Sequence, residues 1–225
     1  MTRGVVRVGD TVRRPPSAFG ASVLRRLEQA GFAGAPRWLG TDEVGRDVLS
    51  YLPGWVPGKL RAWSDAQVGA AGALVRELHD ATRGSELVGD QQVVCHHDLG
   101  PNNAVFRDGV PVAFIDFDLA GPGSPLEDLG YMAWLWCVSS KADRASVEAQ
   151  ARQVRVLADG YGLSAAERGL LVDAMLERQC RNVRFWGEVP RGVASAEQVA
   201  ERIAWSRREL GFTVEHREVF DDVLG

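Results

Sequence analysis

Short stretches of alternating apolar and polar residues open the chain. Residues 4–14, GVVRVGDTVRR, predict two strands joined at residues 9–10, and the prolines that follow end the second strand because proline has no N–H to donate to a sheet. A stripe of apolar residues at helical spacing comes next, at residues 23–27. Two more short strands are expected at residues 38–39 and 48–51, around a polar turn. This pattern predicts a small, strand-rich region.

From the Pro-Gly pairs at residues 53–54 and 57–58 onward, the pattern changes from strands to helices. Proline and glycine interrupt regular structure, so this segment is the expected linker between two lobes. Beyond it, a serine followed three residues later by Gln, Glu or Asp predicts a capping box at the start of a helix. The expected boxes are Ser64 with Gln67, Ser140 with Asp143, Ser164 with Glu167, and Ser195 with Gln198. We therefore expect an α+β chain with a small β-rich lobe at residues 1–53 and a larger, mainly helical lobe at residues 54–225.

Composition narrows the class of protein and its partners. The chain has 225 residues, of which 45% are hydrophobic and 25% charged, as in ordinary globular proteins. Its net charge of -4 provides no overall basic field, so neither a nucleic acid nor a membrane is an expected partner. The cysteines Cys95, Cys137 and Cys180 form no C-x-x-C pair, which argues against a disulfide framework and a zinc site. Without a signal-peptide pattern or a long apolar run, the expected location is the reduced cytoplasm.

One stretch, residues 93–118, departs from the helical pattern and predicts a strand, a polar loop and a hairpin. A two-residue turn at the Asp-Gly pair of residues 108–109 would place Asn103 opposite Phe114. Because residues two apart on a strand share a face, Asn103 and Asp116 would then meet diagonally, at roughly 7 Å. The loop that carries Asp98 enters the same open end of the hairpin. Three oxygen-bearing side chains are therefore expected to converge.

This combination of side chains suits metal-assisted phosphoryl transfer. Mg²⁺ binds a few carboxylate or amide oxygens, here those of Asn103 and Asp116, and completes its shell with water and phosphate. A nearby carboxylate that is not a ligand, here Asp98, can accept the proton of a hydroxyl group as that hydroxyl attacks phosphorus. Each of these residues taken alone could instead cap a turn. The set, at this spacing between apolar strands, favours the chemical interpretation.

The same residues form motifs that resemble those of a known protein family. Residues 96–103, HHDLGPNN, are similar to the H-x-D-x-x-x-x-N loop of the aminoglycoside-phosphotransferase and choline-kinase-like family. Residues 115–118, IDFD, resemble the I-D-[FW]-[DE] metal motif of that family. Residues 126–129, LEDL, resemble its downstream D-L segment, and residues 78–79 resemble the L-H that ends one of its helices. The resemblance is close over residues 74–137 and looser back to residue 4.

The resemblance implies a bilobal protein kinase-like fold and an enzyme that uses ATP or GTP with Mg²⁺. It implies that Asp98 is the base that positions or deprotonates the acceptor hydroxyl, and that Asn103 and Asp116 are the magnesium ligands. His96 would pack and form hydrogen bonds within its loop rather than act as an acid. Asp128 would brace the loop through backbone hydrogen bonds.

Two neighbouring residues are less defined by the resemblance. Asp118 would either touch a second metal ion or cap a turn, and both interpretations stay open. His97 fills a variable position of the motif.

The nucleotide side of the resemblance depends on fewer residues. Strand alternation favours Arg14 over Arg13 as the residue that contacts phosphates, with a solvated basic strand end as an equal alternative. Tyr51 and Leu52 are expected at the hinge that meets adenine. Only residues 1–3 precede the first strand, so we expect the first hairpin of a full kinase lobe to be absent. The nucleotide would then be held more openly, or by a partner chain, which leaves a homodimer as an alternative.

Three functions are compared. The leading interpretation is a small-molecule kinase that moves the terminal phosphoryl group of ATP or GTP to a hydroxyl of an aminoglycoside-type antibiotic or a metabolite. Because the first lobe is short and Glu28 lies too near a helix end to pair with Arg14, the alternative is a kinase-like nucleotide- or ligand-binding module with reduced catalysis. A third class is a metal-dependent phosphohydrolase, for which the ligands would be His96, His97, Asp98 and Asp116.

The acceptor of the phosphoryl group is expected to be a small hydroxylated molecule. By the resemblance it would lie against helices of the second lobe that carry Trp134, Trp136, Arg184, Trp186 and Glu188.

Overall fold

The computed structural model describes residues 4–58, 61–190 and 194–225. The chain divides into two compact units, the first made of Met1–Gly58 with Ala73–Asp128 and the second of Lys59–Gly72 with Leu129–Gly225. The lobe boundary expected after residue 53 falls inside the first unit and stays a prediction. Among the described residues, no helix combines the length and apolar character that crossing a membrane requires.

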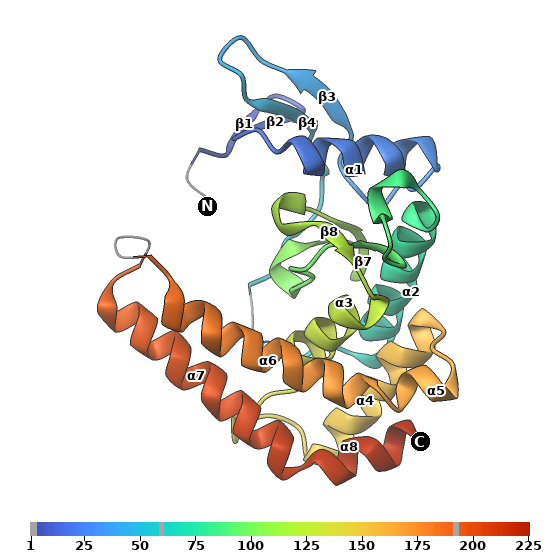
Figure 1. The fold of residues 1–225 in the computed structure, drawn as a ribbon, viewed down its shortest axis with the longest axis vertical. Helices are drawn as coiled ribbons and strands as arrows, with labels where there is room; N and C mark the ends of the chain where they lie inside the picture. Colours follow the sequence, from blue (N-terminus) through green and yellow to red (C-terminus); the bar gives the residue numbers. More distant parts are fainter. Residues whose placement is uncertain (1–3, 59–60, 191–193) are drawn as a thin grey trace. The chain divides into compact units, whose positions relative to one another are not determined.

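A four-stranded antiparallel sheet forms the N-terminal part of the first unit (Figure 1). Its spatial order is β1-β2-β4-β3, and all four strands were expected from the alternating pattern. Their bounds are β1 (Val6–Val8), β2 (Thr11–Arg14), β3 (Trp38–Thr41) and β4 (Asp47–Ser50). Helix α1 (Ala18–Gln29) begins at the N-cap Ser17 and buries its predicted apolar stripe.

Asp47 ties the sheet to the start of α1. It lies opposite Arg14 in the β2–β4 ladder and is buried. Its carboxylate accepts the main-chain N–H of Ser17 at 2.8 Å and the indole N–H of Trp38 at 2.9 Å. A buried carboxylate needs such donors, because burying its charge without partners is costly. Asp47 therefore fixes the end of the strand that carries Arg14.

The rest of the first unit holds two small antiparallel pairs. Strands β5 (Val93–Cys95) and β8 (Gly121–Gly123) form one pair, and β6 (Ala104–Arg107) and β7 (Val110–Phe114) form the other. Short 3₁₀ turns lie among them, namely η1 (Glu86–Val88), η2 (Pro101–Asn103) and η3 (Phe117–Leu119).

The predicted turn of the β6–β7 hairpin is confirmed, but its predicted register is wrong. Asp108 and Gly109 have φ angles of 49° and 81°, as a two-residue hairpin turn requires. The ladder then shifts between Val105 and Phe106, so that Ala104, not Asn103, lies opposite Phe114. Pro111 explains the shift, because a residue without an N–H interrupts a ladder and favours a bulge. Asn103 and Phe114 consequently do not share a face.

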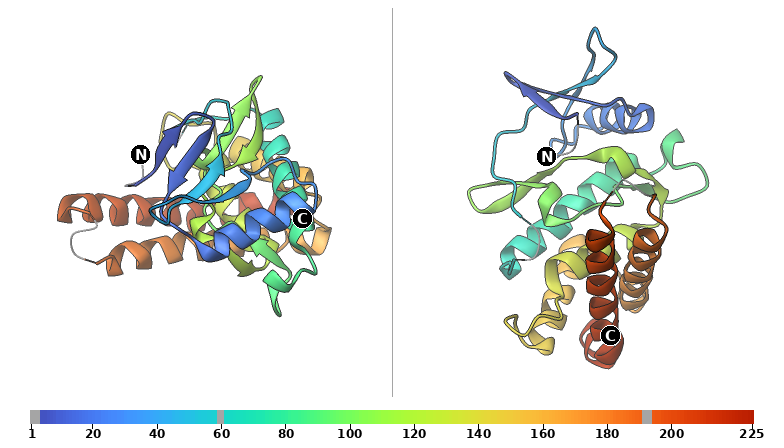
Figure 2. Two further views of the ribbon diagram at one scale, coloured as in Figure 1. Left: turned by 90° about the horizontal axis from the view of Figure 1, so that it is seen from above. Right: turned by 90° about the vertical axis from the view of Figure 1, so that its left-hand side faces the viewer.

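The second unit is helical. Its elements are π-helical turn η4 (Ala133–Cys137), α4 (Val147–Tyr161), α5 (Ala165–Arg168), α6 (Leu171–Glu188), α7 (Ala196–Glu215) and α8 (Arg217–Leu224). Helices α2 (Asp65–Thr82) and α3 (Pro125–Met132) contribute residues to both units. Helices α6 and α7 lie side by side (Figure 2).

Three of the four predicted capping boxes are present. The boxes at Ser164 and Ser195 are present, and Ser64 exchanges the same two hydrogen bonds with Gln67 at the start of α2. The box predicted at Ser140 is wrong. There the N–H and hydroxyl of Ser140 bind the carboxylate of Glu209 instead, and α4 begins later, capped by Ser146.

Candidate active site

A loop between β5 and β6, residues 96–103, carries three of the predicted site residues, His96, Asp98 and Asn103, and we name it the HHD loop. Its first residues are held by Asp128 from α3. Oδ2 of Asp128 accepts the main-chain N–H of His96 at 2.7 Å, and Oδ1 accepts that of His97 at 2.7 Å. The bracing that the resemblance implied for Asp128 is therefore present in the hydrogen bonds.

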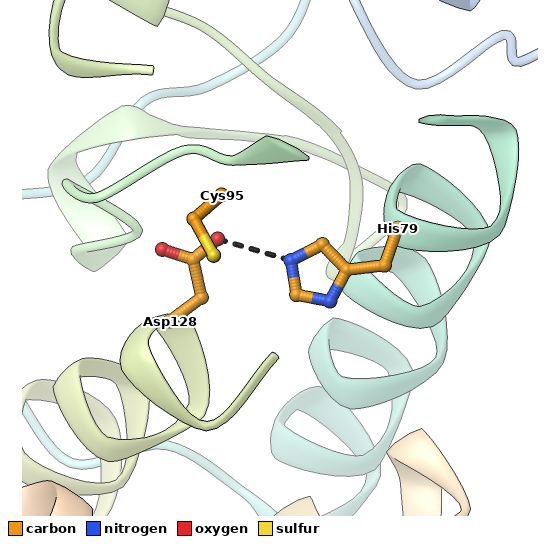
Figure 3. A group of neighbouring side chains, drawn as sticks. All are labelled: His79, Cys95 and Asp128. Atoms are coloured by element: carbon orange, nitrogen blue, oxygen red, sulfur yellow. Dashed lines mark hydrogen bonds and ion pairs between the residues drawn. The ribbon is translucent and has the colours of Figure 1, made fainter. Parts of the chain in front are cut away.

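His79, at the end of α2, completes this brace. Its Nε2 lies 3.1 Å from Oδ2 of Asp128, and both side chains are fully buried (Figure 3). Burial alone would raise the pKa of the Asp128 carboxyl, but the hydrogen bond from His79, its charge and the main-chain donors outweigh burial and lower the pKa to about 2. Sequence reasoning noted His79 only as part of a motif and missed this contact.

Cys95 lies beside the same pair (Figure 3). The possible ligand atoms of His79, Cys95 and Asp128 lie within 4.8 Å of one another, which is close enough for a metal ion. However, the Cys95 thiol donates to the carbonyl of Ser124 at 3.1 Å, and the Asp128 carboxylate already accepts several N–H groups. The hydrogen bonds account for this cluster as a brace without an ion.

His96 connects the HHD loop to the segment after β7. Its Nε2 donates to the carbonyl of Ile115 at 3.0 Å, its Nδ1 accepts the main-chain N–H of Asp98 at 3.3 Å, and its ring packs 4.6 Å from the Phe117 ring. Desolvation of the fully buried ring lowers the pKa of His96 and keeps it neutral. Since both ring nitrogens are used, the metal-dependent phosphohydrolase loses one of its expected ligands.

Asp98 and Asn103, the third and last residues of the HHD loop, are in direct contact. The side-chain amide of Asn103 donates to the Asp98 carbonyl at 2.8 Å and to its carboxylate Oδ2 at 2.8 Å. The 3₁₀ turn η2, which starts at Pro101, bends the chain so that this contact forms. Asn103 is buried, and its Oδ1 accepts the side-chain amide of Asn102 at 3.1 Å. An amide oxygen thus lies next to a carboxylate.

Arg14 joins the sheet to the residues after β7, which we name the IDFD loop (residues 115–118). Its Nη2 lies 2.9 Å from Oδ1 of Asp116 and is also paired with Oδ2 of Asp118. Arg14 is buried, and its expected contact with phosphates stays a prediction. The pairing with Asp118 was missed, because it joins residues that are far apart in the sequence.

The IDFD loop has two unusual local features. Asp116 has a φ angle of 72°, which is uncommon for a residue other than glycine and is found where function or packing imposes it. Burial raises the pKa of Asp118, with the charge of Asp116 acting in the same direction and Arg14 acting against both. Two adjacent acids thus share one arginine, and a further cation would relieve their repulsion.

Tyr51 and Leu52 follow β4. The Tyr51 N–H already donates to the Asp10 carbonyl at 2.8 Å, and the Arg7 guanidinium lies 3.6 Å from the centre of the Tyr51 ring. A nucleotide base at this position would therefore have to use the Tyr51 carbonyl or Leu52. Glu28, considered as a partner of Arg14, instead pairs with Arg37 at 3.5 Å.

Taken as a donor set, these residues fit a divalent cation and a phosphate. Amide and carboxylate oxygens are the ligands that Mg²⁺ prefers, and a buried arginine flanked by acids suits a phosphate brought in with a metal ion. The Ile115 N–H donates to the Asn103 carbonyl at 2.9 Å, so the main chains of Asn103 and Asp116 run next to each other. The structure thus brings together Asp98 with Asn103 and Arg14 with Asp116, within one compact unit.

The sequence is similar to known proteins. The sequence profile described as the phosphotransferase enzyme family matches residues 20–170. A curated relative, the trifolitoxin immunity protein of Rhizobium leguminosarum bv. trifolii, is 34% identical over 98% of this chain and 94% of its own length.

Solved structures share the fold at low sequence identity. A microcompartment-associated aminopropanol kinase matches with a TM-score of 0.65 at 13% identity, over 100% of this chain and 93% of its own. A spectinomycin phosphotransferase, solved with ADP and spectinomycin, matches with a TM-score of 0.61 at 10% identity, over 93% of this chain and 85% of its own. The expected α+β kinase-like fold is confirmed. The chain belongs to the phosphotransferase enzyme family.

Proposed function

We propose that this protein transfers the terminal phosphoryl group of ATP or GTP to a hydroxyl group of a small molecule. The observation that carries the proposal is the pair of contacts in the first unit, Asp98 with Asn103 at 2.8 Å and Arg14 with Asp116 at 2.9 Å. Together they provide a base, oxygen ligands and a cation for phosphate, which are the groups that phosphoryl transfer requires.

In this proposal Asp98 orients the acceptor hydroxyl and accepts its proton as the oxygen attacks phosphorus. Asn103 keeps the Asp98 carboxylate in place through its amide hydrogen bond. Asn103 and Asp116 would hold Mg²⁺, and Asp118 offers a further carboxylate. The bound ion would neutralise charge on the phosphates. Arg14 would turn from the two acids toward a phosphate oxygen. His96 positions the loop and takes no proton.

The acceptor is proposed to be a small antibiotic or an amino alcohol. Support comes from the family and from the names of similar proteins, which refer to aminopropanol, spectinomycin and immunity to trifolitoxin. A suitable screen measures ADP formation from Mg-ATP in the presence of aminopropanol, spectinomycin or trifolitoxin.

The test of the mechanism is the substitution Asp98→Ala, with Asp98→Asn as the conservative variant. If Asp98 is the base, the rate with the best acceptor should fall by about 10²–10⁴-fold. Folding should be preserved, because the Asn103 amide keeps its bond to the Asp98 main-chain carbonyl. The exposed Asp90 gives a matched control, and Asp90→Ala should keep full turnover. Full turnover in purified Asp98→Ala protein would rule out the role.

A second candidate function is a binding module that does not turn over a nucleotide. It is favoured by the engagement of Arg14 with both acids and by the use of the Tyr51 N–H within the first unit. Thermal unfolding with and without Mg-ATP separates the two candidates when it is combined with the ADP assay, since a ligand that binds the folded state raises the melting temperature. A shift without turnover of any acceptor would favour the module.

A further inference from the structure

A cavity of about 270 Å³ lies in the second unit, and its lining residues include none of the candidate active site. Its apolar walls include two buried indoles, Trp63 and Trp136, whose rings are 5.2 Å apart and inclined by 41°. The volume is slightly below the range of about 300–1,000 Å³ that is usual for pockets binding drug-sized ligands. The cavity therefore suits a molecule with a single ring.

The charged groups around the cavity favour an anion. Arg61, Arg144 and Arg152 line it, and Asp65 is the only acid among the described residues that line it. The Arg61 guanidinium lies 5.0 Å from the centre of the Trp63 ring and brings a positive charge next to this indole. Helices α2 and α4 both begin at the cavity, and the N-terminal ends of helices add positive potential.

Two glutamines make the walls of the cavity firm. The buried Gln150 accepts the Ser139 N–H at 2.8 Å and donates to the Ala145 carbonyl at 2.9 Å, which ties α4 to the chain after η4. Gln153 donates to the Trp63 carbonyl at 2.8 Å and to Asp65 at 3.2 Å, which ties α4 to α2. These bonds fix the main chain on both sides of the cavity before any ligand arrives, so little ordering cost remains for binding.

Helix geometry adds an independent sign of function. Helix α3 continues into the π-helical turn η4, and the last residues of that turn, 135–137, line the cavity. Single π-helical turns are rare and occur frequently at functional sites, because they disturb helical hydrogen bonding.

From these observations we infer that the cavity binds a small aromatic anion, with the ring against Trp63 and Trp136 and the acidic group near Arg144 and Arg152. The anionic group is a carboxylate or a phosphate ester. The inference does not rest on the proposed phosphotransferase function, although Trp136 also lies in the region where the resemblance implied the acceptor, and its test does not depend on turnover.

The experiment titrates the full chain with benzoate and with phenyl phosphate, following tryptophan fluorescence and heat of binding. Benzyl alcohol tests the ring without the charge, and inorganic phosphate tests the charge without the ring. At least one aromatic anion should bind with a Kd below about 1 mM, and at least tenfold more tightly than both reference compounds. The better of the two anions identifies the acidic group.

Variants locate the binding site. Arg144→Gln and Arg152→Gln should each weaken binding about tenfold. The exposed Arg207 on α7 is a matched control, and Arg207→Gln should bind normally. Arg14→Gln should also bind the aromatic anion normally, because Arg14 lies in the candidate active site and not in the cavity. Absence of binding, equal binding of benzyl alcohol, or loss of binding in Arg14→Gln but not in the cavity variants would each overturn the inference.

Discussion

Two loops form the candidate active site, and they are held in different ways. The HHD loop is fixed by Asp128 and His79, whose side chains are 0% exposed. The IDFD loop is held by ion pairs from Arg14 to Asp116 and Asp118, whose side chains are 34% and 45% exposed. The first arrangement is closed to solvent, whereas in the second a buried arginine meets two partly exposed acids.

The difference fits a structural role for the brace of the HHD loop and the proposed ligand-binding role for the IDFD loop. A buried carboxylate with several donors cannot exchange partners without leaving groups unsatisfied, so it positions the loop permanently. An ion pair near solvent contributes little to stability and can exchange partners at small cost. A fixed loop suits a base that must be oriented, and an exchangeable cluster suits entry of a cation and a phosphate.

Asp128→Ala is expected to have the largest effect, because it removes the buried brace of the HHD loop. It would leave the main-chain N–H groups of His96 and His97, together with His79, without their buried acceptor. We expect the free energy of unfolding to fall by about 3–5 kcal/mol, the usual cost of removing one partner of a buried charged pair. Urea unfolding followed by circular dichroism measures it, with Asp90→Ala as control. A loss below about 1 kcal/mol would show that the brace contributes no more than a surface contact.

The next effect concerns the open side of the site. Arg14→Gln removes the cation that pairs with Asp116 and Asp118, and we expect Mg-ATP affinity to fall roughly 10–100-fold, as for loss of a charged hydrogen bond. Arg13→Gln is the matched control, since Arg13 is the neighbouring arginine and lies 3.9 Å from Asp42 instead. Calorimetric titration gives both affinities. Equal losses of Mg-ATP affinity in the two variants would mean that the cluster of Arg14 with Asp116 and Asp118 does not bind phosphate.

Features that depend on neighbouring residues were predictable from the sequence. The hairpin turn at Asp108 and the capping boxes at Ser164 and Ser195 are decided by residues within a few positions of each other. The bulge at Pro111 follows the same local chemistry, yet it was overlooked, and one residue of slip changed the face on which Asn103 was expected.

Contacts between distant parts of the chain were not predictable in the same way. The pair of Arg14 with Asp118 spans 104 positions, and the bond of Ser140 to Glu209 spans 69. No local pattern distinguishes these partners from other arginines, serines and acids. Likewise the motif that includes His79 indicated a helix end, but only the fold brings His79 against Asp128.

Acid titration sharpens the comparison by isolating the charge of Asp128. Its pKa is lowered from 3.8 to about 2 in the folded protein, so the unfolded chain binds more protons between these values and stability falls as the pH drops through that window. The expected loss is about 2 kcal/mol between about pH 4 and pH 2. Unfolding curves at a series of acidic pH values should show this loss, and Asp128→Asn should lack it. The same slope in both proteins would assign the loss to other carboxylates.

The smallest expected effect is the one that Asp118→Ala has on stability. The substitution removes the ion pair of Asp118 with Arg14. It also removes the repulsion between Asp118 and Asp116 and the cost of burying the Asp118 charge, which raises the pKa of Asp118. Because these effects oppose each other near solvent, the free energy of unfolding should change by less than about 1 kcal/mol. Asp118→Asn, which keeps the size of the side chain, should behave alike. Urea unfolding of the Asp118 variants, in parallel with Asp128→Ala, gives these changes in the free energy of unfolding. A loss above about 2 kcal/mol in Asp118→Ala would mean that the ion pair of Asp118 is as indispensable as the Asp128 brace. The acids of the IDFD loop would then not be free to exchange partners.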